Sequence, residues 1–136
     1  REVCELAGER GVTLAVEPLS PVETSFLTSC REARRFIAAV NRPACRLHLD
    51  IKAMTHETAG PVATILEHRW EVVHFHGNDV NLRGPGQGPT EIQPIADALK
   101  AIDYQGWVSV EPFDYHPNPD DCARISLKNL HASFLG

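Results

Sequence analysis

The 136-residue chain lacks the features of several large classes of protein. Its 13 Lys and Arg residues stand against 18 Asp and Glu residues, a net charge of −5. With no basic surplus to drive counterion release, a nucleic acid is not expected as its main partner. No apolar run approaches the ~18 residues that a membrane helix needs, and no signal-peptide pattern is present. We therefore expect no membrane partner and a cytoplasmic location.

The chain also lacks a closely spaced cysteine pair. Its cysteines are far apart, which argues against a disulfide framework or a thiolate zinc site. They are expected to be reduced, packed thiols: Cys4, Cys30, Cys45 and Cys122. Hydrophobic residues at 43% and charged residues at 23% are ordinary globular values, and the length suits one domain of ~100–200 residues.

What the chain does have is a regular alternation of predicted strands and helices. Strands are predicted at residues 12–17, 45–50, 71–76 and 107–111. Helices are predicted at residues 1–10, 28–41, from Pro61 onward, 91–103 and 120–134. A glycine- and proline-rich loop covers residues 78–89. This order predicts a parallel sheet, either an open doubly wound sheet or part of a (β/α)8 barrel.

The two faces of the predicted strands decide between these architectures. One face is wholly apolar: Leu14, Val16, Leu47, Leu49, Val73, Phe75, Val108 and Val110. The other face is mostly not: Thr13, Ala15, Arg46, His48, Val72, His74, Trp107 and Ser109. A doubly wound sheet is covered by helices on both faces and should be apolar on both, whereas a barrel wall can have a polar interior.

A closed barrel needs about 200 residues or more, so four strands form only half of one. The chain also begins at Arg1, without Met, inside a predicted helix. We therefore predict the C-terminal half of a TIM (β/α)8 barrel. Residues 1–136 would be a single partial domain whose N-terminal half is absent, with four strands and about five helices.

Each predicted strand ends on a residue that can bind a metal ion: Glu17, Asp50, His76 and Glu111. Because neighbouring parallel strands lie ~4.8 Å apart, four consecutive strand ends can converge on one ion. Three oxygen donors and one nitrogen donor suit Mn²⁺, Mg²⁺ or Co²⁺ better than a thiolate-preferring metal. The alternative is that these strand-end side chains simply face solvent.

Five short segments resemble the xylose-isomerase-like TIM barrels, and within them most closely the sugar phosphate isomerases and epimerases. The segments are Ala-Val-Glu-Pro at 15–18, His-Leu-Asp at 48–50, His-Phe-His at 74–76, Gly-Pro-Gly-Gln-Gly at 84–88 and Tyr-Gln-Gly-Trp-Val-Ser-Val-Glu at 104–111. The resemblance covers essentially the whole chain but only the C-terminal half of the family's barrel. It implies that Glu17, Asp50, His76 and Glu111 are the metal ligands.

The resemblance also implies a reaction on a sugar or sugar phosphate. In the epimerases of this family, the residues that match Glu17 and Glu111 act as acid and base on opposite faces of the sugar. A metal-polarised carbonyl makes the neighbouring proton acidic and stabilises a cis-enediolate. Return of the proton from the opposite face gives epimerisation, and return to the adjacent carbon gives isomerisation.

Four further residues are predicted to bind substrate. Arg83 resembles a family arginine that reaches a substrate hydroxyl or phosphate. His48 and His74 lie one layer below the metal and can orient a ligand or bind a sugar oxygen. Lys52 is the nearest charged residue to Ala53, where the family's epimerases carry a histidine.

Other residues are assigned mainly structural positions. Asn78 and Asp79 are predicted to anchor the loop that follows His76. His68, His116 and His131 are predicted at the surface.

Alternative functions remain at this point. A dehydratase of a cyclic polyol ketone uses the same superfamily and metal geometry. A half-barrel can also be a catalytically inactive fragment, or an interaction module that pairs with a missing N-terminal half or with a second copy in a homodimer.

Overall fold

The computed structural model describes all of residues 1–136 and contains one four-stranded parallel sheet. The strands are β1 (Leu14–Val16), β2 (Cys45–Asp50), β3 (Val72–Gly77) and β4 (Trp107–Val110), and they lie side by side in chain order. A doubly wound sheet reverses its strand order part-way across, whereas a barrel wall does not. The unreversed order is therefore that of a barrel wall.

Six helices connect and flank the strands. They are α1 (Glu2–Glu9), α2 (Cys30–Val40), α3 (Ile51–Met54), α4 (Gly60–Glu67), α5 (Ile92–Ala101) and α6 (Pro119–Leu135). The side chain of Ser29 accepts a hydrogen bond from the backbone N–H of Glu32 and so begins α2. The sequence pattern did not predict α3, a single turn that the side chain of Asp50 caps directly after β2.

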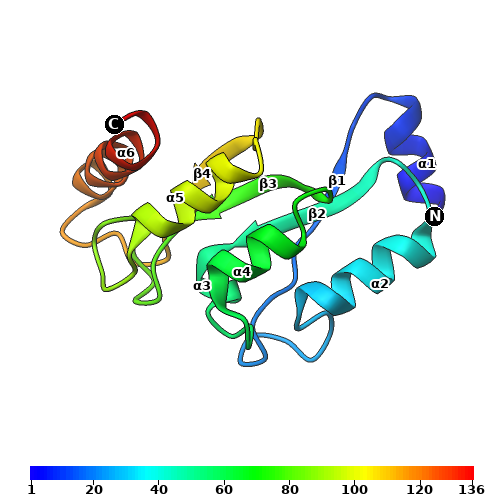
Figure 1. Cartoon of the computed structure of the whole chain (residues 1–136), viewed down its shortest axis with the longest axis horizontal. Helices are drawn as coiled ribbons and strands as arrows, with labels where there is room; N and C mark the ends of the chain where they lie inside the picture. The colour runs from blue at the N-terminus through cyan, green and yellow to red at the C-terminus, as the bar shows by residue number, and fades with distance from the viewer.

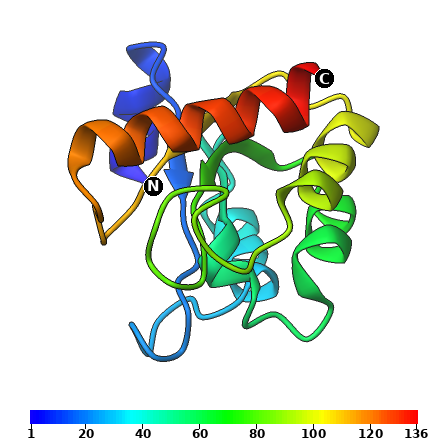
Figure 2. The same ribbon diagram turned by 90° about the vertical axis from the view of Figure 1, so that its left-hand side faces the viewer.

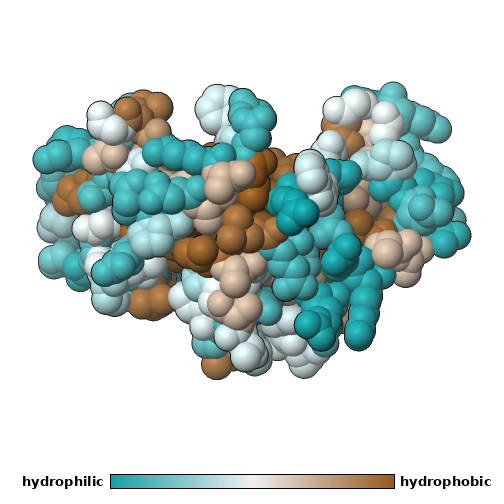
Figure 3. Space-filling view, viewed as in Figure 1, coloured by the Kyte–Doolittle hydropathy of each residue, from teal (hydrophilic) through white to brown (hydrophobic).

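The helices α2, α4 and α5 lie along one side of the sheet (Figure 1). Helix α6 packs against α5 and β4, as both views show (Figures 1 and 2). The predicted apolar face of the strands supplies the core beneath these helices, with Leu47, Leu49 and Phe75 at most 1% exposed. Hydrophobic residues also gather around α4 and α5 on the outer surface (Figure 3).

One strand departs from the predicted alternation. In the register of β2 with β3, Leu47 pairs with Val72 and His48 pairs with His74, so Val73 has no partner. This bulge places Val72 in the hydrophobic core, 8% exposed. The prediction that Val72 shares the face of His74 and that Val73 lies in the core was wrong, because the extra residue shifts the phase.

The sheet has two open edges, since β1 and β4 each pair with one neighbour only. Trp107, at the start of β4, is 81% exposed. No helix of the chain has both the length and the hydrophobicity that crossing a bilayer would require.

Candidate metal centre

The four strand-end side chains meet in space. Glu17 follows β1, Asp50 ends β2, His76 lies near the end of β3, and Glu111 follows β4. One ligand atom from each lies within 4.8 Å of every other. They meet because consecutive parallel strands end at one edge of the sheet, with Asp50 and His76 directly paired in the register.

The Nδ1 atom of His76 lies at the centre of this group. It is 3.0 Å from Oε2 of Glu111, 3.8 Å from Oδ2 of Asp50 and 3.9 Å from Oε1 of Glu17. It is also buried and has no hydrogen-bond partner of acceptable geometry. Donors bound about 2.0–2.2 Å from one ion lie about 3–4 Å apart. The spacing, the unpartnered nitrogen and the donor types therefore fit a divalent cation.

The electrostatics of the group point the same way. Burial, with the nearby charges of Asp50 and Glu111, raises the pKa of Glu17 to about 7. Burial also raises the pKa of Asp50, although hydrogen bonds from Ala53 and Asn78 oppose the shift. Carboxylates that repel one another in a partly dry site are stabilised by a shared cation.

A hydrogen-bond network fixes the orientation of Asp50. Its Oδ1 accepts a hydrogen bond from the backbone N–H of Ala53 at 2.8 Å, and its Oδ2 accepts one from the Asn78 amide at 2.5 Å. The Asn78 side-chain oxygen accepts a hydrogen bond from the backbone N–H of Lys52 at 2.9 Å. Asn78 thus ties the end of β3 to Asp50 and α3, a role that its place after a strand did not reveal.

Two more histidines lie on the inner face of the sheet, as predicted, but their surroundings differ. The Nε2 atom of His74 is 3.0 Å from Oγ of Ser109. The Nε2 atom of His48 has no hydrogen-bond partner and is 4.0 Å from Oε1 of Glu17. Burial, followed by the effects of His76 and His74, lowers the pKa of His48 to about 3, so its ring is neutral near pH 7.

Lys52 lies beside the centre but is already paired. Its Nζ is 2.5 Å from Oε1 of Glu23 and 4.4 Å from the centre of the Phe113 ring. Glu23 comes from the loop after β1 and also accepts a hydrogen bond from the Ser20 hydroxyl. The ion pair thus links this loop to α3, and the Lys52 charge lowers the pKa of both Glu17 and Asp50.

Arg83 is paired with a residue outside the four-donor group. Its Nε lies 3.0 Å from Oδ2 of Asp114, so it joins the loop after β3 to the loop after β4. The fully buried Asp79 anchors the first of these loops by accepting a hydrogen bond from the backbone N–H of Thr90, as predicted.

The loop after β3 requires glycine at position 86. Gly86 has a φ of 77°, and a side chain there would meet Asn129 of α6.

His68 corrects one sequence prediction. It is 3% exposed rather than at the surface, and its Nδ1 lies 3.0 Å from Oε2 of Glu71. Glu71 also pairs with Arg34 of α2 at 2.8 Å. His68 therefore belongs to a polar contact in the helical layer, outside the four-donor group.

Consecutive parallel βα units with polar side chains converging at the carboxyl ends of the strands define a protein of the TIM-barrel class. A family model described as "Xylose isomerase-like TIM barrel" matches residues 1–132. The chain belongs to this family.

Curated relatives of the chain are sugar epimerases. It is 31% identical over 113 residues to D-psicose 3-epimerase of Enterocloster bolteae, covering 83% of this chain and 38% of that protein. It is 27% identical over 113 residues to L-ribulose 3-epimerase of a Methylomonas species, covering 83% of this chain and 40% of that protein. The chain thus spans about two fifths of the length of these relatives.

A solved structure shows the same fold. The 3-keto-D-glucoside 4-epimerase of Escherichia coli superposes with a TM-score of 0.90 at 24% identity, covering 97% of this chain and 50% of that chain. The likeness confirms that the four strands and six helices are one half of a TIM barrel.

Proposed function

We propose that the chain carries the metal centre and the acid–base pair of a divalent-metal-dependent epimerase or isomerase of a sugar or sugar phosphate. The observation that carries this proposal is the convergence of Glu17, Asp50, His76 and Glu111 within 4.8 Å. The epimerase names of the relatives support the reaction class.

The four donors are suited to hold the ion. Three carboxylates and one imidazole favour Mn²⁺, Mg²⁺ or Co²⁺. Once bound, the ion would polarise a substrate carbonyl and its neighbouring hydroxyl. The C–H proton on the hydroxyl-bearing carbon next to the carbonyl would then become acidic. The chain's own residues must then move that proton.

Glu17 and Glu111 would move it from different sides in this proposal. They follow β1 and β4, the two outer strands, with His76 between them. One carboxylate removes the proton, which leaves an enediolate, and the other returns a proton to the opposite face.

Four other residues are proposed to bind substrate, and two of them are already engaged in ion pairs. His74 and His48 lie on the inner face below the donors and can contact a sugar oxygen or orient a donor. Lys52 is already paired through Nζ with Glu23, and Arg83 is paired through Nε with Asp114. We expect these two ion pairs to rearrange if a phosphate enters.

A calorimetric Mn²⁺ titration of the purified chain tests the metal centre. We expect one ion per chain, with binding lost or greatly weakened in Glu111→Gln. Glu67→Gln, on the exposed side of α4, is the matched control and should bind as the wild type does. No binding by a chain shown to be folded would contradict the proposal.

Turnover is tested by incubating the Mn²⁺-loaded protein with ketoses and ketose phosphates in D₂O. We expect deuterium at the carbon beside the carbonyl, and an epimer or isomer as product. Glu17→Gln and Glu111→Gln should each lower the rate at least about 100-fold, the usual scale of a lost acid or base. Loss of water from the substrate would instead identify a dehydratase.

We further propose that four more strands complete the substrate pocket, from a longer polypeptide or from a second copy in a homodimer. The open edges of β1 and β4 and the partial coverage of the relatives support this. Light scattering at the concentration used for turnover gives the oligomeric state. Full turnover by a monomer of these 136 residues would contradict the proposal.

A further inference from the structure

His48 is a buried histidine whose ring has a nitrogen without a partner. The residue lies in β2 and is only 6% exposed, and its Nε2 makes no hydrogen bond. A buried polar atom is normally paired, so an unpaired one beside a candidate ion site is evidence for a ligand.

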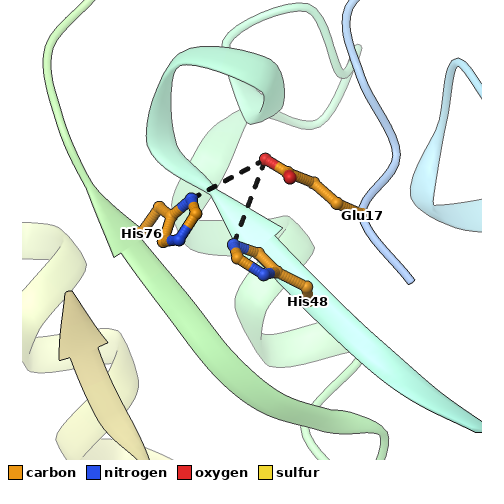
Figure 4. A group of neighbouring side chains, drawn as sticks. All are labelled: Glu17, His48 and His76. Carbon is orange, nitrogen blue, oxygen red and sulfur yellow. Dashed lines mark ion pairs between the residues drawn. The ribbon is translucent and has the colours of Figure 1, made fainter. Parts of the chain in front are cut away.

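The unpaired nitrogen faces the metal centre. Figure 4 shows one oxygen of the Glu17 carboxylate facing a nitrogen of both the His48 and the His76 ring. Its Oε1 is 4.0 Å from Nε2 of His48 and 3.9 Å from Nδ1 of His76. The ligand atoms of these three residues all lie within 4.8 Å of one another.

The two rings are oriented so that both nitrogens can reach one ion. Their centres are 4.0 Å apart and their planes are inclined by 82°, which is an edge-on arrangement rather than a stack. His74 has the same inward direction but differs in its partner, because its Nε2 is already 3.0 Å from the Ser109 hydroxyl. Of the two histidines below the centre, His48 alone has a free ring nitrogen facing Glu17.

We propose that Nε2 of His48 is a metal-ligating atom, so that Glu17, His48 and His76 form a nitrogen-rich three-donor site that shares two residues with the four-donor group. This inference rests on the proposed metal site and extends it. Two imidazoles and one carboxylate suit borderline ions such as Co²⁺, Ni²⁺, Cu²⁺ and Zn²⁺. Mn²⁺ and Mg²⁺ would instead depend on the carboxylates of Asp50 and Glu111.

Pulsed electron paramagnetic resonance of the Cu²⁺-loaded chain tests this directly, because it counts coordinated imidazoles. We expect two in the wild type, from His48 and His76, and one in His48→Gln. In titrations, His48→Gln should weaken Co²⁺ binding by about 10–100-fold and change Mn²⁺ binding far less. His74→Gln is the matched control and should keep two imidazoles.

The wild-type spectrum alone decides the question, even if His48→Gln folds poorly. A single coordinated imidazole in the wild type would overturn the proposal and leave His48 as a residue that orients Glu17. An equal loss of Mn²⁺ and Co²⁺ affinity in a folded His48→Gln would also overturn it. Failure of the wild type to bind any of these ions would contradict the four-donor site itself.

Discussion

The side-chain amide of Asn78 donates a hydrogen bond to Oδ2 of Asp50 at 2.5 Å, and both side chains are buried, at 0% and 2% exposure. The same Asn78 side chain accepts a hydrogen bond from the backbone of α3. Together with the backbone N–H of Ala53, which binds Oδ1, this residue outside the donor set fixes which Asp50 oxygen faces His76. Such supporting contacts determine metal affinity as well as stability.

Asn78→Leu keeps the number and branching of the side-chain heavy atoms and removes both hydrogen bonds. We expect Mn²⁺ affinity to fall about 10–100-fold and the free energy of unfolding to fall by about 1–3 kcal/mol. Titration calorimetry and urea denaturation measure the two effects. Asn129→Leu, on the partly buried face of α6, is a control that should not alter the metal affinity. Unchanged Mn²⁺ affinity in Asn78→Leu would show that Asp50 is oriented without it.

Glu17 should make the metal-free chain less stable as pH rises. Its pKa is raised from 4.5 to about 7, so the native state retains a proton that the unfolded state loses in this window. The Glu17 contribution to the free energy of unfolding therefore decreases between these two pH values, by about 1–3 kcal/mol in total.

Comparison with Glu17→Gln isolates this effect. Relative to the wild type, the variant should gain stability between about pH 4 and about pH 8, as measured by urea denaturation with a chelator present. His48, whose pKa is lowered to about 3, acts in the opposite sense, but it is present in both proteins and cancels in the difference. If the free energy of unfolding changed with pH in the same way in both proteins, the raised pKa of Glu17 would be contradicted.

Lys52 should hold the pKa of Glu17 below the value that burial alone would give, because its positive charge favours the carboxylate. In Lys52→Met the pKa of Glu17 is therefore expected to rise further. Carbon-13 NMR of labelled glutamate side chains during a pH titration measures it. Lys100→Met, in α5, serves as the control since Lys100 binds Ser133. A lower Glu17 pKa in Lys52→Met would contradict the assignment.

The loop after β3 should not tolerate a side chain at Gly84. A Cβ there would lie 1.9 Å from Oγ of Ser126, which is fully buried in α6. We expect Gly84→Ala to lower the free energy of unfolding by about 1–3 kcal/mol. Gly8→Ala is the matched control, because its Cβ would meet Ala44 at an ordinary 3.6 Å and alanine favours a helix. Equal stability of the two variants would show that α6 moves aside.

The sequence pattern predicted the parallel half-barrel and the meeting of the four donors for the same reason. Residues that end consecutive parallel strands and point to the same face of the sheet must lie close together, whatever loops connect the strands. It could not predict that Val73 has no partner, since a bulge changes pairing without changing the residue types. Nor could it predict that Asp50 begins a helical turn or that Arg83 pairs with Asp114, because both depend on contacts far apart in the chain.

The bulge at Val73 has a consequence for changes in the length of β3. Because Val73 pairs with no residue of β2, the strand can lose this position while His74 and His76 keep their register with His48 and Asp50. Removal of Phe75 would instead turn one of the two histidines into the hydrophobic core. We therefore expect β3 to tolerate a deletion at Val73 but not one at Phe75.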